Sequence, residues 1–274
     1  MTQSSPATAP SAAASGSLTI GTDLAVHRLG FGAMRLTGTG VWGAPADRAA
    51  AIRVLRRALE LGVNFIDTAD SYGPGVSEEI IAEALHPYPP GLVIATKGGL
   101  TRAGPGHWGR DGHPAYLRAA CEGSLKRLRV ARIDLYQLHA VDPRVPLEDS
   151  LGELARLRTA GKIRHIGVSN VSAQELARAQ RLVSVVSVQN RYNLADRDSE
   201  DVLKSCERAK IAFIPWFPLG AGRDAANAQR AIAWLLARSP VMLPIPGTSS
   251  VAHLEENVAA ASLRLSKQDL QAMT

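Results

Sequence analysis

Cysteine is scarce in this chain. Cys121 and Cys206 are the only two among 274 residues, and they lie far apart in the sequence. Two widely separated thiols provide neither a disulfide framework nor the spacing of a metal site. We therefore expect both to be inert, partly buried side chains, and we expect no metal centre.

Long hydrophobic runs are also missing, and no stretch approaches the roughly 20 apolar residues that a membrane span needs. The first residues, MTQSSPATAPSAAASGS, contain no Lys or Arg and no run of Leu, Val or Ile, so they lack the features of a signal peptide. We expect a soluble, cytoplasmic protein without membrane contact. The same segment has little bulky apolar surface to offset the entropy of ordering, which predicts a disordered tail over residues 1–16.

Acidic residues are outnumbered, with 25 Asp and Glu against 31 Lys and Arg, for a net charge of +6. The basic residues are spread along helical stretches, as in Arg53, Arg56 and Arg57, and form no block interleaved with aromatic residues. This pattern is typical of solvated helix faces and argues against a nucleic-acid partner. A positive field would still favour an anionic cofactor such as a dinucleotide.

Short apolar runs alternate with amphipathic stretches of helical period from Leu18 onward, after a hairpin around the turn Gly21-Thr22-Asp23. Runs such as LVIAT and IDLYQL are nearly continuous, as expected for parallel strands buried on both faces. The expected strands are Gly30–Met34, Asn64–Thr68, Leu92–Lys97, Ile133–His139, His165–Ser169, Val185–Gln189, Ala212–Trp216 and Met242–Pro246.

The intervening stretches predict helices, with Asp47 and Ser77 as N-caps of the first two. Eight strand–helix units with right-handed crossovers close into a (β/α)8 TIM barrel, which needs roughly 250 residues. We therefore expect an α/β fold in which residues 17–274 form a single barrel domain with an N-terminal β-hairpin. The expected helices are Arg48–Leu61, Ser77–Leu85, Pro114–Leu128, Leu147–Ala160, Ala173–Leu182, Asp198–Ala209, Ala225–Ala237 and Val251–Ala259.

Polar residues follow the expected strands at the end where barrel enzymes carry their active sites. Five successive strands end in a polar or ionisable residue, namely Asp67, Lys97, His139, the pair Ser169-Asn170 and the pair Gln189-Asn190. One or two such residues could arise by chance, but five at one rim indicate a site.

Four residues of this rim form a proton-donating set: Asp67, Tyr72, Lys97 and His139. Tyrosine has an unperturbed pKa of about 10, and a nearby lysine ammonium stabilises tyrosinate and lowers that pKa. Asp67 can keep Lys97 charged in a dry pocket, and a neutral His139 can hydrogen-bond a carbonyl oxygen. The set suits protonation of an alkoxide while hydride reaches the carbon.

The segment Gly38-Thr39-Gly40-Val41-Trp42-Gly43 matches the dinucleotide pattern G-x-G-x-x-G. That pattern requires the first glycine to end a strand and the third to open a helix. Thr37 follows MRL before the first glycine, and Pro45-Ala46-Asp47 follows the last. We interpret the segment as a flexible loop over the site and place the dinucleotide across the barrel rim instead.

The segments LGFGAMRL, NFIDTADSYGPGVSEE, VIATK, DLYQLH, GKIRHIGVSN, VQNRYN, WFPLGAG and PIPGTSSVAHLEENV resemble, in order and spacing, the aldo-keto reductase superfamily from about Leu18 to Leu265. The resemblance implies an oxidoreductase that reduces aldehydes or ketones with NADPH in preference to NADH. It implies Tyr72 as general acid, Lys97 and Asp67 as its tuning pair, and His139 as the group that orients the substrate. A small carbonyl compound would be the partner, and the protein a monomer or weak homo-oligomer.

The resemblance also implies the cofactor contacts. The positions that match the nicotinamide ribose contacts are Gly32, Ala33 and Met34, with Asp67 nearby, and those that match the carboxamide contacts are Ser169, Asn170 and Gln189. The stacking position corresponds to Trp216 and Phe217, and the pyrophosphate contacts correspond to Leu219 and Gly220. The adenosine and 2′-phosphate end corresponds to Gly247, Thr248, Ser249, His253, Glu256 and Asn257.

The sequence departs from this pattern at two places. Many members carry Lys and Arg near positions 247 and 253 to grip the 2′-phosphate, where this chain has Gly247 and His253. The segment between Gly220 and Trp234 is short, whereas relatives have a longer segment that straps the cofactor down. We expect a more open cofactor cleft and weaker binding.

Two other functions remain open. The short strap is compatible with a low-turnover NADPH sensor built on the same barrel, and Lys97 could serve as a Schiff-base nucleophile in an aldolase. Substrate choice would depend on loops in which Trp42, Trp108 and Phe217 could form an apolar wall. Trp42 and Trp108 could equally be loop anchors.

Overall fold

Seven parallel strands form the central sheet of the structure, a computed structural model that describes residues 10–220 and 225–273. Their order is β11-β10-β9-β8-β5-β4-β3, so each strand pairs with the strand of the next strand–helix unit in the sequence. The strands are β3 (Phe31–Gly32), β4 (Phe65–Asp67), β5 (Val93–Gly98), β8 (Ile133–Leu138), β9 (Ile163–Ser169), β10 (Val185–Arg191) and β11 (Ala212–Trp216).

The eighth position of the barrel is occupied by an extended segment, residues 241–245, and the expected strand Met242–Pro246 is not a regular one. Leu243 N–H donates to the Phe213 carbonyl at 2.8 Å, and Gly30 N–H donates to the Pro244 carbonyl at 3.0 Å. The segment therefore bridges β11 and the start of β3. Pro244 and Pro246 lack N–H groups, which prevents a continuous ladder.

The expected first strand Gly30–Met34 is reduced to the two residues of β3, and residues 33–36 form a 3-10 helix instead. The barrel is narrow here, since a Cβ atom on Gly32 would lie 2.7 Å from the Ile245 carbonyl oxygen. The glycine is needed for this close backbone approach. The strand-to-loop transition therefore comes early and brings Met34 to the rim.

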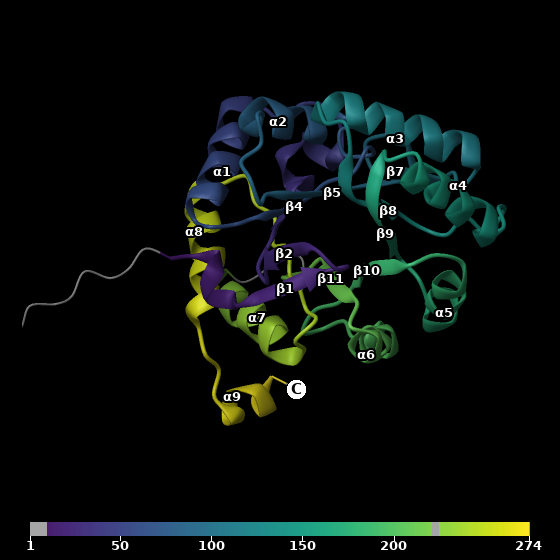
Figure 1. The fold of residues 1–274 in the computed structure, drawn as a ribbon. Coiled ribbons are helices and arrows are strands. Elements are labelled where there is room, and N and C mark those ends of the chain that lie inside the picture. Colours follow the sequence, from purple (N-terminus) through teal and green to yellow (C-terminus); the bar gives the residue numbers. More distant parts are fainter. Residues whose placement is uncertain (1–9, 221–224, 274) are drawn as a thin grey trace, which may run out of the picture.

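Helices surround the strands, as Figure 1 shows. Most of their bounds agree with the expected ranges to within two residues. They are α1 (Arg48–Glu60), α2 (Val76–Leu85), α3 (Pro114–Leu128), α4 (Leu147–Thr159), α5 (Ala173–Leu182), α6 (Glu200–Ala209), α7 (Ala225–Arg238) and α8 (Val251–Ala259), followed by the short helix α9 (Lys267–Ala272).

The two expected N-caps differ in outcome. Asp47 caps α1, where its side chain accepts the Ala50 N–H at 2.7 Å. Ser77 does not cap α2, because the helix begins after Gly75 and the Ser77 hydroxyl donates to the Ala33 carbonyl inside the barrel wall. Ser77 is fully buried, so packing rather than capping explains this serine.

Two apolar layers hold the barrel together. The larger lies between the helices and the sheet, and the smaller fills the barrel interior. The N-terminal hairpin of β1 (Ser17–Ile20) and β2 (Leu24–His27) contributes Ile20, Leu24 and Val26 to this inner layer, so it covers the end of the barrel opposite the strand ends that carry the polar rim. Both cysteines lie in the larger layer, where burial raises the pKa of each thiol to about 12, consistent with inert side chains.

The prediction of a disordered tail over residues 1–16 is wrong for residues 12–15. Residues 12–15 form a 3-10 helix capped by Ser11, with Ala12 fully buried and its N–H donating to the Leu61 carbonyl at 2.8 Å. Ala12 joins the hydrophobic core and the partly buried Ala14 packs against it, and composition alone does not reveal this docking. Residues 1–9 lie outside the described part.

A second hairpin, β6 (Leu100–Gly104) and β7 (His107–Arg110), was not predicted. It extends from the end of β5 over the barrel mouth.

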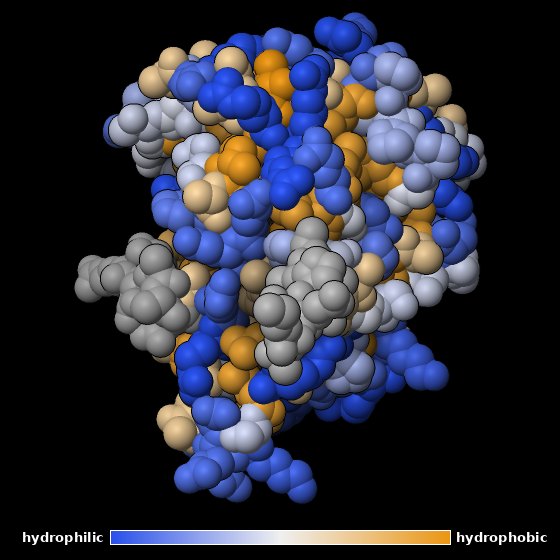
Figure 2. All heavy atoms as spheres, turned by 90° about the vertical axis from the view of Figure 1, so that its left-hand side faces the viewer, coloured by the Kyte–Doolittle hydropathy of each residue, from blue (hydrophilic) through white to orange (hydrophobic). Residues whose placement is uncertain are grey.

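On the face shown in Figure 2, hydrophilic side chains cover much of the surface, and hydrophobic side chains reach the surface between them. Among the described residues, no helix combines the length and the apolar character that crossing a membrane requires.

Candidate active site

Asp67 and Lys97 meet at the rim because they end two neighbouring parallel strands, β4 and β5. Lys97 Nζ lies 2.7 Å from Asp67 Oδ2 and donates to the Thr68 carbonyl at 2.8 Å. Lys97 is fully buried and Asp67 is 2% exposed. Burial lowers the pKa of Lys97, but the charge of Asp67 and the contact with Tyr72 outweigh it, so its pKa is raised overall and the ammonium stays charged.

Tyr72 reaches this pair from the loop between β4 and α2. The loop folds back because Asp70 N–H donates to the Lys97 carbonyl at 3.2 Å and Gly75 N–H donates to the Asp70 carbonyl at 2.7 Å. Lys97 Nζ donates to Tyr72 Oη at 3.4 Å, and the ammonium lies 5.1 Å from the centre of the tyrosine ring. The expected chain from Asp67 through Lys97 to Tyr72 is therefore present.

The pKa of Tyr72 is raised overall, in contrast to the sequence-based expectation. Burial of the hydroxyl is the largest cause, and the positive charge of Lys97 opposes it without overcoming it. Tyr72 is only 6% exposed. The tyrosine is thus held in its protonated form at neutral pH.

His139 follows β8 and lies beside Tyr72. Its ring is edge-on to the Tyr72 ring, with centroids 5.9 Å apart, and its Nδ1 lies 3.4 Å from Ser71 Oγ. Burial, and secondarily the charge of Lys97, lowers the pKa of His139 well below its usual value. The neutral imidazole expected from the sequence agrees with this direction.

Two glutamines hold the other oxygen of Asp67. Gln189 Nε2 donates to Asp67 Oδ1 at 2.8 Å, and Gln137 Nε2 donates to the same atom at 3.2 Å. Gln137 was missed by the sequence reasoning. A fully buried glutamine inside the apolar strand IDLYQL was the available signal, because a buried amide needs a partner.

A cavity of about 520 Å³ opens at this rim. Most of the predicted site residues line it, whereas Lys97 lies behind Asp67 and Tyr72, and Ala33 is buried. The predicted residues on the cavity are Gly32, Met34, Asp67, Tyr72, His139, Ser169, Asn170, Gln189, Trp216, Phe217, Leu219, Gly220 and Gly247.

Asn170 is engaged by the protein itself. Its Nδ2 donates to the His139 carbonyl at 2.9 Å and to Ser169 Oγ at 3.1 Å, and its Oδ1 accepts from Trp216 Nε1 at 3.0 Å. Its backbone is left-handed, with φ of 56°. Ser169 Oγ also donates to the Gln189 carbonyl at 2.7 Å, so the three carboxamide candidates and Trp216 form one connected group at the cavity wall.

Of the candidates for the adenosine and 2′-phosphate end, Gly247 lines the cavity and the other five do not. Thr248 and Ser249 precede α8, His253 lies in its first turn, and Glu256 and Asn257 lie in its second half; His253 and Glu256 are exposed and Asn257 is buried. Residues 221–224 of the shortened segment after Gly220 lie outside the described part.

Arg35 was missed. It is exposed, lines the cavity beside Gly247, and makes no ion pair among the described residues. Arg35 therefore places a positive charge on the cavity wall beside Gly247. A side chain at position 247 would collide with the Gly32 carbonyl, which explains the glycine.

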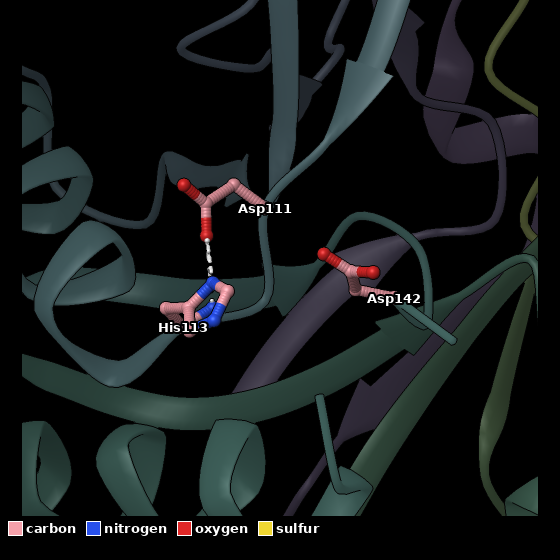
Figure 3. A group of neighbouring side chains, drawn as sticks. All are labelled: Asp111, His113 and Asp142. Atoms are coloured by element: carbon pink, nitrogen blue, oxygen red, sulfur yellow. Dashed lines mark hydrogen bonds and ion pairs between the residues drawn. The ribbon is translucent and has the colours of Figure 1, made fainter. Parts of the chain in front are cut away.

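A second group of potential ligand residues lies in the loops that follow β7 and β8 and is shown in Figure 3: Asp111, His113 and Asp142. His113 Nδ1 contacts Asp111 Oδ1 at 2.8 Å, while Asp142 is turned to Arg144, whose Nη2 donates to Asp142 Oδ2 at 2.9 Å. Hydrogen bonds from Arg144 hold the pKa of Asp142 well below its usual value. The group is thus accounted for as loop hydrogen bonding around an ion pair.

Comparison with known proteins agrees with this geometry. The sequence matches the Aldo/keto reductase family over residues 28–229 and 223–274. It is 49% identical to an uncharacterized oxidoreductase of Schizosaccharomyces pombe over 283 residues, covering 98% of this chain and 92% of the relative. It is 43% identical to pyridoxine 4-dehydrogenase of Escherichia coli over 279 residues, covering 94% and 97%.

Solved structures show the same barrel. A glycerol dehydrogenase from Gluconobacter oxydans superposes with a TM-score of 0.85 at 28% identity, covering 94% of each chain. An aldo/keto reductase from Klebsiella pneumoniae in complex with NADP and acetate superposes with a TM-score of 0.80 at 29% identity, covering 94% of this chain and 93% of the other. The match over nearly the whole sequence and the shared (β/α)8 architecture establish that this chain belongs to the aldo/keto reductase family of oxidoreductases.

Proposed function

We propose that this chain reduces aldehydes or ketones to alcohols with NADPH, with Tyr72 as the general acid. The observation that carries the proposal is the buried contact chain from Asp67 through Lys97 to Tyr72, which ends at the wall of a cavity shared with His139. A reduced nicotinamide supplies a hydride to a carbonyl carbon when it is bound.

Tyr72 then has a defined task, which is to deliver a proton to the carbonyl oxygen as the carbon is reduced. Its raised pKa keeps the proton on Oη until negative charge develops nearby. Lys97, held charged by Asp67, stabilises the tyrosinate that remains. The Asp67–Lys97 pair therefore stabilises the transition state of proton transfer more than the ground state, and this difference lowers the barrier.

His139 orients the substrate in this proposal. A neutral imidazole carries one N–H, and a donor at the cavity wall beside Tyr72 can hydrogen-bond the same carbonyl oxygen. The lowered pKa of His139 prevents it from competing as a general acid. Proton donation and orientation are therefore divided between two residues.

The cofactor site proposed here uses the rest of the cavity. The wall from Gln189 and Trp216 to Leu219 and Gly247 offers both apolar surface and amide groups, which suits a nicotinamide and its ribose. Arg35 supplies positive charge near the outer end. Two Klebsiella pneumoniae relatives were solved with NADP or NADPH, which supports the phosphorylated cofactor.

Cofactor preference is tested by thermal shift with NADPH and NADH, because the ligand that binds the folded state more tightly raises the midpoint further. We expect the larger shift with NADPH. Arg35→Ala should reduce the NADPH shift, with Arg110→Ala, an exposed arginine absent from the cavity wall, as the control. An NADH shift equal to that of NADPH would contradict the preference.

Turnover is tested with a carbonyl panel that includes pyridoxal, because one relative is a pyridoxine 4-dehydrogenase. Tyr72→Phe should lower kcat by about 10²–10⁴-fold while NADPH binding persists. Tyr88→Phe is the matched control, since its hydroxyl donates to the Leu128 carbonyl away from the cavity. Failure of the wild type to consume NADPH with any carbonyl would sink the enzymatic proposal.

The short segment between Gly220 and Trp234 keeps a second candidate open, a low-turnover NADPH sensor. Tight NADPH binding without turnover would favour it. The aldolase alternative is disfavoured by Lys97, whose amine is fully buried and donates hydrogen bonds to Asp67, Thr68 and Tyr72. Absence of borohydride trapping on Lys97 would remove it.

A further inference from the structure

The hairpin β6–β7 forms part of the cavity wall on the side of Tyr72 and His139. Leu100 and Trp108 both line the cavity, and Trp108 is 43% exposed despite its size. Arg102 is the register partner of Trp108 on the facing strand. Its guanidinium carbon lies 3.7 Å from the centre of a Trp108 ring, within the range of a stacked cation–π contact.

Arg102 also ties three separate segments together through backbone carbonyls. Its Nη1 donates to Val41 at 2.7 Å and to Ser71 at 3.1 Å, and its Nη2 donates to Gly40 at 2.8 Å. Further bonds reach Gly104 and His107 within the hairpin itself. Ser71 immediately precedes Tyr72, so the same guanidinium touches the loop that carries the proposed acid.

These contacts explain the glycine-rich segment Gly38–Gly43. Gly40 has φ of 68°, and its carbonyl accepts the Gly106 N–H from the hairpin turn at 3.2 Å. Gly43 N–H donates to the Gly73 carbonyl at 3.1 Å. The left-handed glycine lets the segment turn its carbonyls toward Arg102 and the hairpin, so the segment docks on the substrate side of the rim.

We propose that Arg102 is a positioning residue that assembles this wall, and that the Trp108 indole it holds selects substrates with a flat ring. The inference rests on the proposed function for its setting. Arg102 does not itself line the cavity, whereas Trp108 does, so the indole presents its remaining surface to a ligand. Val41 and Leu100 complete an apolar slot beside Tyr72 and His139.

A planar ring is favoured by the flat surface of the indole, and this surface is held in place by Arg102. A flat ring stacks on an indole with its faces in contact, which a puckered ring of the same size cannot do. Trp108 cannot swing freely, because the guanidinium against it is anchored to fixed carbonyls. Arginine suits this role better than lysine, since it combines a flat stacking surface with several donors in a fixed geometry.

Binding is measured first, because it does not require turnover. The probes are benzamide and cyclohexanecarboxamide, two six-carbon rings that differ in being planar or puckered, added to the NADPH-loaded protein and followed by calorimetry. We expect the wild type to bind the planar probe with a Kd about tenfold lower than that of the puckered probe. Trp108→Ala should bring the ratio near one, and Trp108→Phe should keep most of it.

Arg102→Ala should lower the same ratio of affinities for the planar and puckered probes, although Arg102 itself does not contact the ligand. Arg102→Lys should not restore this ratio. Arg110→Ala is the matched control on the facing strand of the hairpin, and its ratio should equal that of the wild type. If Arg102→Ala does not fold, Arg102→Lys decides the role of Arg102. Equal ratios in the wild type, Trp108→Ala and Arg102→Lys would overturn the inference.

Kinetics with benzaldehyde and cyclohexanecarbaldehyde separate this inference from the proposed function. We expect Trp108→Ala to raise the KM of the planar aldehyde about tenfold with little change in kcat. Selective binding without reduction of either aldehyde would refute the proposed function and support the wall. Reduction of both aldehydes with unchanged KM in Trp108→Ala would refute the wall alone.

Discussion

Replacing Lys97 by Met probes the buried pair at the base of the proposed site. The change keeps a long side chain of similar volume but removes the ammonium that contacts Asp67 Oδ2 at 2.7 Å. At that distance the attraction between two unit charges is about 6 kcal/mol for an effective dielectric constant of 20. Desolvation of both charges offsets part of it.

The net cost follows from what remains behind. Asp67 is 2% exposed and would retain the donors of Gln137 and Gln189 without a counter-ion. Leaving one member of a buried pair uncompensated typically costs about 3–5 kcal/mol, and we expect Lys97→Met to lower the free energy of unfolding by this amount. Adding Asp67→Asn should recover part of the loss, because the unpaired charge disappears.

Urea unfolding of the wild type, both single variants and the double variant gives the coupling energy, provided that the m-value stays constant. Lys126→Met is the control, since Lys126 is exposed on α3 without an ion pair among the described residues, and it should stay within about 0.5 kcal/mol. A loss below about 1 kcal/mol for Lys97→Met, or strictly additive single effects, would refute the reasoning.

Three further predictions follow from single residues. Burial, and secondarily Glu78, raises the pKa of Asp70 to about 8, so the folded state holds a proton that the unfolded chain releases above about pH 4. Stability should therefore fall as pH rises from about 4 to about 8, and Asp70→Asn should raise the urea midpoint more at pH 8 than at pH 5; an equal gain at both would contradict this. Asp47→Ala removes the cap on the Ala50 N–H and should cost about 1 kcal/mol in thermal unfolding, whereas an unchanged melting temperature would argue against the cap. The lowered pKa of His139 predicts no inflection from this residue in kcat/KM near pH 6.5, and such an inflection, lost in His139→Gln, would show that the imidazole titrates.

Local patterns in the sequence were sufficient for the helices and for the order of the barrel strands. Residues 114–128, 173–182 and 251–259 agree with the expected helices at both ends, because amphipathic spacing and capping act over a few neighbouring residues. The hairpin β6–β7 escaped prediction because TRAGPGHWGR has neither alternation nor a long apolar run. Its contacts are made instead with segments distant in the sequence, through Arg102 and through the Gly106 N–H, which donates to the Gly40 carbonyl.

The sequence by itself determined the barrel, the strand ends that carry Asp67, Lys97 and His139, and the family. Only the tertiary structure decided that burial outweighs Lys97 in raising the pKa of Tyr72, and that Arg102 joins three loops into one wall. The reason is physical: periodicity and capping depend on near neighbours along the chain. Desolvation and side-chain hydrogen bonding depend on groups that only folding brings together.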